Sequence, residues 1–294
     1  RRPVEQAMHI ITDAAGSIGR ETTAGLGVTI LDSYITVGER SLPETHYAPE
    51  ELYAAMRRGV KVSTAQASVF ERHEHYRSVL DRYPRVLYLC VGSAFTGNYG
   101  EALAWQQRHD RERRFTVIDS GAASGRLGLL ALATARFALG TRDAQEVIRY
   151  AREGAARCQE YVFLDTLRYL AAGGRLSRTG AFFGDMLQMK PVISPFPEGA
   201  RKMGVVRNRT EQLKFALEKL TAALETNGRA MIMIEYTDNL AWVTKKVQPE
   251  IVRRWPEAEI ILHPMSLTSG AHMGPGTWAV AFLPDPFPKT ERTR

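Results

Sequence analysis

The fold class is decided by the segment Val86-Leu87-Tyr88-Leu89-Cys90-Val91-Gly92-Ser93-Ala94-Phe95-Thr96-Gly97-Asn98-Tyr99. Its first six residues form an unbroken apolar run, the pattern of a strand buried on both faces of a parallel sheet. Small and hydroxyl-bearing residues follow, ahead of a segment that we expect to be helical. Since open α/β sheets bind ligands at the carboxyl ends of their parallel strands, the loop after this strand is predicted to border a binding site.

The same alternation of short β-branched runs and longer helical-period segments extends along the chain in both directions, which predicts an α/β fold. Two domains are predicted: residues 1–160, with a mainly parallel sheet and flanking helices, and residues 161–294, a second α/β domain. The predicted strands of the first domain are 9–12, 28–37, 86–91 and 115–119, with helices at 48–58, 67–83 and 121–139. In the second domain, strands at 161–164, 191–196, 202–207, 230–236, 259–263 and 278–283 accompany helices at 210–226 and 240–255.

The composition indicates a globular, soluble protein. Of the 294 residues, 44% are hydrophobic and 24% are charged, enough to bury a substantial core and unlike a disordered chain. The formal net charge is +7, but acidic residues are interleaved with the basic ones even in the densest run, Arg111-Glu112-Arg113-Arg114. This pattern argues against a nucleic-acid surface, although a mildly positive field would attract an anionic ligand or an acidic partner.

The cysteine content and the lack of long apolar segments predict a cytoplasmic location. Cys90 and Cys158 are the only cysteines, too few for a disulfide framework and too far apart for a CxxC metal site. No stretch approaches the roughly 18 apolar residues of a membrane span, and the first residues lack the apolar region of a signal peptide. Neither a bound cofactor nor a metal is expected.

Hydroxyl side chains gather in the loops that follow the predicted strands. Thr64 and Thr96 each precede a predicted helix, where free backbone N–H groups and the helix dipole favour an anion. Each hydroxyl alone could simply cap its helix. Several such loops together predict an anion site, and without a neighbouring lysine or a Mg²⁺-binding carboxylate they favour a carboxylate over a phosphate.

At these positions the chain resembles the DegV family, and the resemblance extends over nearly its whole length. The family's T-S-Q-P-S motif matches residues 64–68, S-S-x-L-S-G-T-Y matches 92–99, and V-I-D-S matches 117–120. Its L-x-Y-L-x-x-G-G-R-I motif matches 167–176, followed by L-x-I-K-P at 187–191. The late R-T and H-x-G-x-G elements match 209–210 and 272–276. The order and spacing of these motifs are more specific than any one of them.

The resemblance implies a fatty-acid-binding protein that carries one long-chain fatty acid and presents it to a fatty acid kinase subunit, without being an enzyme itself. It implies that the fatty-acid carboxylate is bound by Thr64, Thr96 and His272. The predicted binding set is completed by Ser93, Gly97 and Asn98. Arg209 is expected at the rim, facing the kinase or the head group. Transient contact with a membrane surface is compatible with this role.

The chain also departs from the family pattern. The opening D-S-T appears as Asp13-Ala14-Ala15, which removes two hydroxyls, and Ala65 and Ala67 replace the serine and proline of T-S-Q-P-S. Arg126 stands in a helix where apolar residues are usual. We still expect the chain to bind a carboxylate, because Thr96 keeps the hydroxyl of the serine that it replaces.

An acyl chain needs a wall of adaptable apolar side chains, and residues 181–189 are predicted to form part of it because methionine repacks easily. Gly180 and Gly184 would let this segment move as a lid. An ordinary core segment is the alternative interpretation. The candidate tail-lining residues are Phe182, Phe183, Met186 and Met189.

Two enzyme classes are the rival hypotheses. A dinucleotide-dependent oxidoreductase would use residues 14–19, which half-match G-x-G-x-x-G but lack the first glycine. A serine hydrolase could combine Ser120, His272 and Asp119, although no G-x-S-x-G motif is present. A metal hydrolase built on His73 and His75 is disfavoured, because residues two apart point to different faces of a helix.

Overall fold

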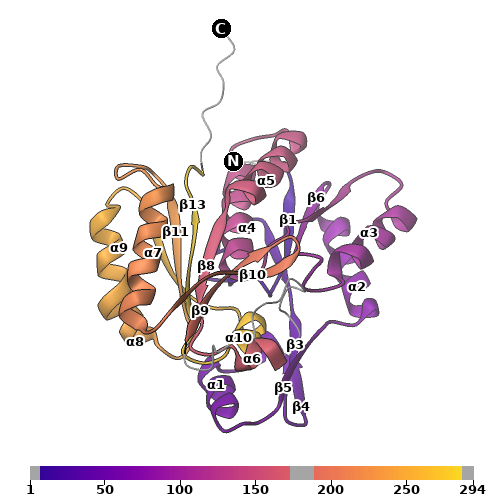
Figure 1. The fold of residues 1–294 in the computed structure, drawn as a ribbon. Coiled ribbons are helices and arrows are strands. Elements are labelled where there is room, and N and C mark those ends of the chain that lie inside the picture. The colour runs from indigo at the N-terminus through magenta and orange to yellow at the C-terminus, as the bar shows by residue number, and fades with distance from the viewer. Residues whose placement is uncertain (1–6, 173–188, 287–294) are drawn as a thin grey trace.

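The computed structural model describes residues 7–172 and 189–286. Three sheets are formed within these ranges, and helices separate and cover the two larger ones (Figure 1). The four-stranded sheet has the order β2 (Val28–Leu31), β1 (His9–Asp13), β6 (Val86–Cys90) and β7 (Phe115–Asp119), with every pair parallel. One face carries α2 (Val69–Arg82) and α3 (Asn98–His109).

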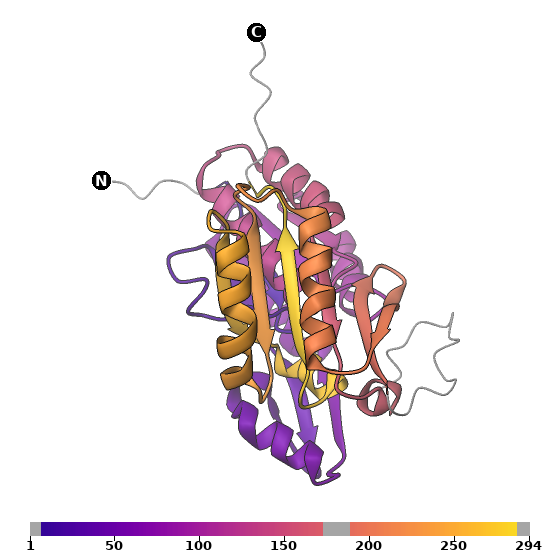
Figure 2. The same ribbon diagram turned by 60° about the vertical axis from the view of Figure 1, so that its left-hand side comes forward.

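The six-stranded sheet contains the later strands and is mostly antiparallel, with one parallel pair, β11 and β12. Its outer face is covered by α7 (Arg209–Ala223) and α9 (Gln248–Arg254), which lie in front of the strands in Figure 2. The strand order is β10 (Gly199–Val206), β9 (Lys190–Phe196), β8 (Gln159–Phe163), β13 (Trp278–Leu283), β11 (Met231–Tyr236) and β12 (Glu259–Pro264).

Helix α4 (Ser124–Leu139) lies between the two large sheets and contacts both, with α5 (Ala144–Arg157) beside it. Most of its residues are buried, as its nearly continuous apolar sequence predicts. A single hydrophobic cluster therefore joins strands of both sheets through α4. The predicted α/β fold is confirmed, and the predicted boundary after residue 160 falls inside β8.

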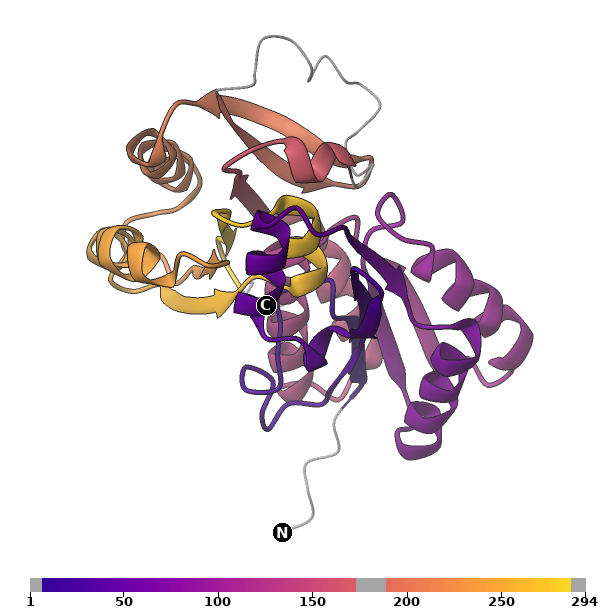
Figure 3. The ribbon, with the colours of Figure 1, turned by 90° about the horizontal axis from the view of Figure 1, so that it is seen from below.

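A small antiparallel sheet, in the order β4 (Arg40–Pro43), β3 (Ser33–Val37) and β5 (Val62–Gln66), extends below the large sheets. Figure 3, from below, shows that α10 (Leu267–Met273) lies in the middle of the molecule beside α1 (Pro49–Arg57). Helix α6 (Arg168–Ala172) also contacts α10, and a 3₁₀ turn spans Glu44–His46.

The structure corrects several sequence expectations in this region. The predicted strand 28–37 is divided between β2 and β3, which belong to different sheets. Thr64 lies on strand β5 and not in a loop before a helix, and His272 lies on α10 and not in a loop. Polar strands and a glycine-containing short helix have weak sequence signals, since neither shows a clear apolar period.

Elsewhere the observed helices are shorter than predicted or are divided into several segments. The helix predicted at 240–255 consists of α8 (Leu240–Trp242), a π turn (Val243–Val247) and α9. Pro249 has no N–H to donate to the preceding turn, which accounts for the wider π turn just before it. Helix α5 was missing from the prediction, although Asp143 caps its first turn through Gln145 N at 2.9 Å.

The close approach of α4 to the loop after β1 requires a glycine at position 128. A Cβ there would overlap the carbonyl oxygen of Ser17, a backbone atom that has little freedom to move. We expect Gly128→Ala to destabilise the fold by about 2 kcal/mol, because overpacking outweighs the gain in helix propensity. Calorimetric unfolding measures the effect, with Gly100→Ala on α3 as the control, since a Cβ at Gly100 meets no atom within 4 Å. Equal shifts in both variants would contradict this packing constraint.

Candidate functional site

An apolar cavity lies where the carboxyl ends of the four-stranded sheet meet β5, α10 and the six-stranded sheet. Segments from both halves of the chain form its wall, so neither half could build it alone. Its apolar lining comes from Ala15, Val91, Phe95, Ala123, Val162, Leu170, Ile193, Pro195, Ala200 and Met273. Its polar lining comes from Thr64, Gln66, Thr96, Ser124, Glu160, Thr268, Ser269 and His272.

The Thr64 and His272 side chains meet at this cavity. The two-residue alternation of β5 turns Thr64 and Gln66 inward and leaves Ala65 exposed. His272, in the last turn of α10, places Nε2 2.8 Å from Thr64 Oγ1. Both residues also border an outer groove that contains Lys61 and Arg168. The hydrogen-bonded pair thus stands between the apolar cavity and a more basic surface.

Thr96 lines the same cavity from the loop after β6. Its Oγ1 accepts from Asn98 N at 3.3 Å, and the Asn98 side chain donates to Gln66 Oε1 at 2.7 Å. The buried Asn98 therefore ties α3 to β5 behind the cavity wall. Ser93 and Gly97, in the same loop, are exposed and do not line the cavity.

Asp13, at the end of β1, fixes the loop that carries Thr96. Its carboxylate accepts from Val91 N at 2.8 Å and from the Tyr88 hydroxyl. The buried Arg72 guanidinium lies 3.9 Å from Asp13 Oδ1 and donates to the Tyr88 hydroxyl at 3.0 Å. Burial raises the pKa of Asp13, although Arg72 and these hydrogen bonds oppose the rise. We infer a structural role for the aspartate of the opening motif.

Glu44 holds the first turn of α10. Its Oε1 accepts from Leu267 N at 2.5 Å and Thr268 N at 3.2 Å and lies 2.8 Å from Ser266 Oγ, and its Oε2 accepts from Thr268 Oγ1 at 2.9 Å. These contacts satisfy N–H groups that have no partner within the helix. Burial raises the pKa of Glu44 to about 7. The acid orients the helix that carries His272, a role that sequence reasoning missed.

The two alanines of the opening motif occupy different surroundings. Ala15 lines the cavity, where the family hydroxyl would have added a polar group. Ala14 lies against α10, and its carbonyl accepts from Ser266 Oγ at 2.5 Å. The replacement at Ala15 therefore makes the cavity wall more apolar, whereas the one at Ala14 lies outside this cavity.

A second set of polar groups, Glu160 and Glu235, was not predicted. Both carboxyls are fully buried beside the first turn of α4. Glu235 Oε1 accepts from Ser17 Oγ at 2.5 Å and Ser124 Oγ at 2.9 Å, while Glu160 Oε2 accepts from Arg126 N. Burial raises the pKa of Glu235 to about 7, and burial together with the neighbouring Glu235 raises that of Glu160 well above its usual value. A charged residue inside an apolar strand, as in Ile234-Glu235-Tyr236, is the sequence signal that could have revealed them.

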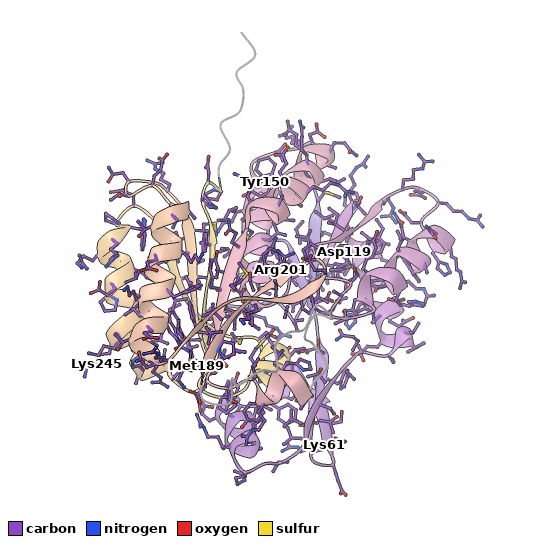
Figure 4. All side chains as sticks on the ribbon, in the orientation of Figure 1. Lys61, Asp119, Tyr150, Met189, Arg201 and Lys245 are labelled. Atoms are coloured by element: carbon purple, nitrogen blue, oxygen red, sulfur yellow. The ribbon has the colours of Figure 1, made fainter. Side chains whose placement is uncertain are left out.

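The remaining predicted site residues lie away from this cavity. Arg209 is exposed at the start of α7, with its guanidinium 4.9 Å from the centre of the Trp242 ring. Met189 is half-buried at the lower end of β9 (Figure 4) and does not line the cavity. Phe182, Phe183 and Met186, with the glycines of the predicted lid, lie outside the described residues.

The residues of the rival enzyme hypotheses have other partners. Ser120 Oγ donates to Cys90 O at 2.6 Å, and Asp119 Oδ1 accepts from the backbone of Ser93 and Gly121. His73 bonds Glu101 at 2.5 Å. Within the described ranges, no three histidine, cysteine, aspartate or glutamate side chains are placed to hold a metal ion. No helix in those ranges has the length and apolar character to cross a bilayer.

The family model for DegV, described as an uncharacterised protein family of that name, matches residues 7–285. The chain belongs to the DegV family. Among curated relatives, the DegV domain-containing protein YteA of Lactococcus lactis is 28% identical over 265 residues, covering 88% of this chain and 89% of YteA. The DegV domain-containing protein CPE0026 of Clostridium perfringens is 24% identical over 284 residues, covering 94% and 97%.

Several solved structures share the fold over nearly its whole length. A fatty-acid-binding DegV protein from Thermus thermophilus superposes with a TM-score of 0.85 at 22% identity, covering 95% of this chain and 99% of that one. A stearic acid-binding protein from Eubacterium ventriosum gives 0.84 at 19% identity with the same coverage. DegV of Bacillus subtilis, described as a fatty acid binding protein, also gives 0.84 at 19% and the same coverage.

The DegV motifs meet in this structure although they are far apart in the sequence. Gly274, at φ 93°, packs so closely on the Tyr169 ring that a Cβ would overlap it. Gly276 N donates to Asp238 Oδ1 at 2.7 Å. Lys190 bonds Asp165 Oδ1 at 2.5 Å, which ties the start of β9 to the segment after β8. Gly274 of the last motif thus allows α10 to end against α6.

We expect the buried acids to make folding stability depend on pH. Because the pKa of Glu235 rises from 4.5 to about 7 on folding, the folded state retains a proton that the unfolded state loses. The stabilisation that this proton gives to the folded state is fully present below about pH 4.5. It decreases as the pH rises to about 7, and the free energy of unfolding does not change further above that pH on account of this group. In Glu235→Gln the free energy of unfolding should decline less between these pH values. At pH 8 the variant should be more stable than wild type, as measured by chemical unfolding. The exposed Glu218→Gln on α7 is the control, and a Glu235→Gln curve parallel to wild type would refute the assignment.

Proposed function

We propose that this chain binds one long-chain fatty acid in the apolar cavity, with the carboxylate at the Thr64–His272 pair, and presents it to a fatty acid kinase subunit for acyl phosphate formation. The observation that carries the proposal is the position of this pair, at the point where the apolar cavity meets the outer basic groove. The solved structures of a DegV family protein from T. thermophilus, described as fatty-acid-binding, and of a protein from E. ventriosum, described as stearic acid-binding, support the ligand class.

The balance of energies fits an amphipathic ligand. Burying a methylene contributes about 0.8 kcal/mol, so a chain of roughly fifteen contributes on the order of 12 kcal/mol before costs. A hydrogen bond to a charged group contributes about 1.5 to 3 kcal/mol. The tail therefore supplies most of the affinity, while the head site selects a carboxylate and sets its direction.

Thr64 and His272 can serve a carboxylate together. In the tautomer with hydrogen on Nε2, His272 donates to Thr64 Oγ1, and the threonine hydrogen is left to donate to the ligand. The Thr96 hydroxyl faces the same cavity and offers another donor. Asn98 supports this wall through Gln66, and we place Ser93 and Gly97 in the flanking loop that the kinase would contact.

Arg209 suits a partner contact better than a structural role. A cation in the first turn of a helix opposes the helix dipole, and Asn208 already caps α7 through Glu211 N at 2.9 Å. The guanidinium is exposed above the ring of Trp242, and its planar fork can pair with a carboxylate or phosphate group of a partner. We therefore propose that Arg209 contacts the kinase, and that the chain is a carrier and not itself a catalyst.

Replacement of Thr64 by alanine tests the head site. Thr64→Ala should weaken fatty-acid binding about tenfold or more, because a donor to a partly desolvated charge is lost. Thr64→Ser keeps the hydroxyl and should bind nearly as wild type in a fluorescent fatty-acid displacement assay. The loss of affinity caused by Thr64→Ala should be much smaller for the uncharged methyl ester than for the acid. Equal losses for acid and ester would place the carboxylate elsewhere.

Replacement of Arg209 by alanine separates binding from presentation. We expect Arg209→Ala to keep lipid affinity within about threefold, since the side chain is exposed and outside the cavity, while lowering acyl phosphate formation with the cognate kinase. Arg207→Ala, an exposed arginine two residues earlier, is the matched control. Loss of lipid binding, or unchanged turnover, in Arg209→Ala would show that the partner-facing role is mistaken.

A further inference from the structure

Glu160 faces the cavity from within the six-stranded sheet. Successive residues of β8 alternate between its faces, and Tyr161 and Phe163 pack in the core beneath α7. Glu160 and Val162 lie on the opposite face, and both line the apolar cavity. Glu160 is completely buried, so its carboxyl is directed toward the cavity wall and not toward solvent.

The carboxyl of Glu160 retains hydrogen-bonding capacity. Its Oε1 and the Oε2 of Glu235 are buried and make no hydrogen bond of standard geometry among the described residues, although the Ser124 hydroxyl and the Gly125 N–H lie near enough to lower the pKa values of Glu160 and Glu235 respectively. The other oxygen of each acid is occupied, by Arg126 N and by the Ser17 and Ser124 hydroxyls respectively. A buried polar atom without a partner is costly, so a polar group from a ligand would be favoured at this point.

The backbone of α4 leaves room for both acids. Gly125 lies between them, and a Cβ at this position would be 2.9 Å from Glu160 Oε2 and would overlap the Glu235 carboxyl. Since burial and mutual repulsion raise both pKa values, the pair holds a proton near neutral pH. Such a pair can donate one hydrogen bond and accept another, as a hydroxyl partner requires.

We propose that Glu160 is a specificity-determining residue, which selects a long-chain fatty acid carrying a hydroxyl group on its acyl chain. This inference rests on the proposed function, because it assumes that an acyl chain fills the cavity. The hydroxyl would donate to the Glu160 carboxylate, or accept from the Glu160 carboxyl when this acid holds the proton of the pair. Val162, Ile193 and Pro195 give the cavity apolar wall near Glu160, which suits the methylenes on either side of the hydroxyl.

The test compares stearic acid with hydroxystearic acids that carry the hydroxyl near the carboxylate, at mid-chain or at the terminal carbon. We expect the wild-type chain to bind at least one isomer about tenfold more tightly than stearic acid. Glu160→Leu should abolish that ratio by weakening the preferred hydroxystearic acid more than stearic acid, and Glu160→Gln should retain part of it. Tyr161→Phe, on the opposite face of the same strand and outside the cavity lining, is the matched control and should keep the preference.

The outcomes separate this inference from the proposed function. Stearic acid binding with no isomer preferred by wild type would overturn the role of Glu160 and indicate that buried water satisfies the pair. A preference that survives in Glu160→Leu would also overturn it. Failure of all the fatty acids to bind would instead refute the proposed function. If Glu160→Leu does not fold, the Glu160→Gln ratio and the hydroxyl position in a crystal structure of the wild-type complex give the same decision.

Discussion

Helix α4 is packed between two sheets, and the rest of the architecture depends on this constraint. Its apolar sequence leaves almost no polar face, so burial on one side alone would expose a large apolar surface to water. The six-stranded sheet supplies the second cover, and one core joins both halves of the chain. The glycines at 125 and 128 let the start of the helix approach the loop after β1 and the two buried acids. The cavity lies beside this end of the helix.

The candidate site is consequently assembled from short elements held by buried polar contacts. Glu44 orients α10 and hence His272, while Asp13 fixes the loop that carries Thr96. Thr64 is positioned by the register of β5 against β3, where it pairs with Ile35. These supports lie in the interior, where a hydrogen bond to a carboxylate is screened less than at the surface. The polar groups at the cavity are therefore held in place before any ligand arrives.

Sequence reasoning recovered the features with strong local signals. The apolar strands at 86–91 and 115–119, the buried helix α4 and the ordered DegV motifs were predicted, and the strands, helix and family are confirmed. The motif residues Thr64, Thr96 and His272 do line one cavity, although two of them lie on elements that had been expected as loops. Strand β5 and helix α10 depend on tertiary partners, Ile35 and Glu44, which no local pattern specifies. The buried Glu160–Glu235 pair was missed for the same reason, because its two members are distant in sequence.

The central claim is that the cavity holds a fatty acid, and native mass spectrometry of the intact chain purified from bacteria tests it most directly. The account predicts one long-chain fatty acid per chain, released on denaturation and replaced when an excess of another fatty acid is added. A bound nucleotide in its place, or a chain that neither carries nor takes up a fatty acid, would contradict it.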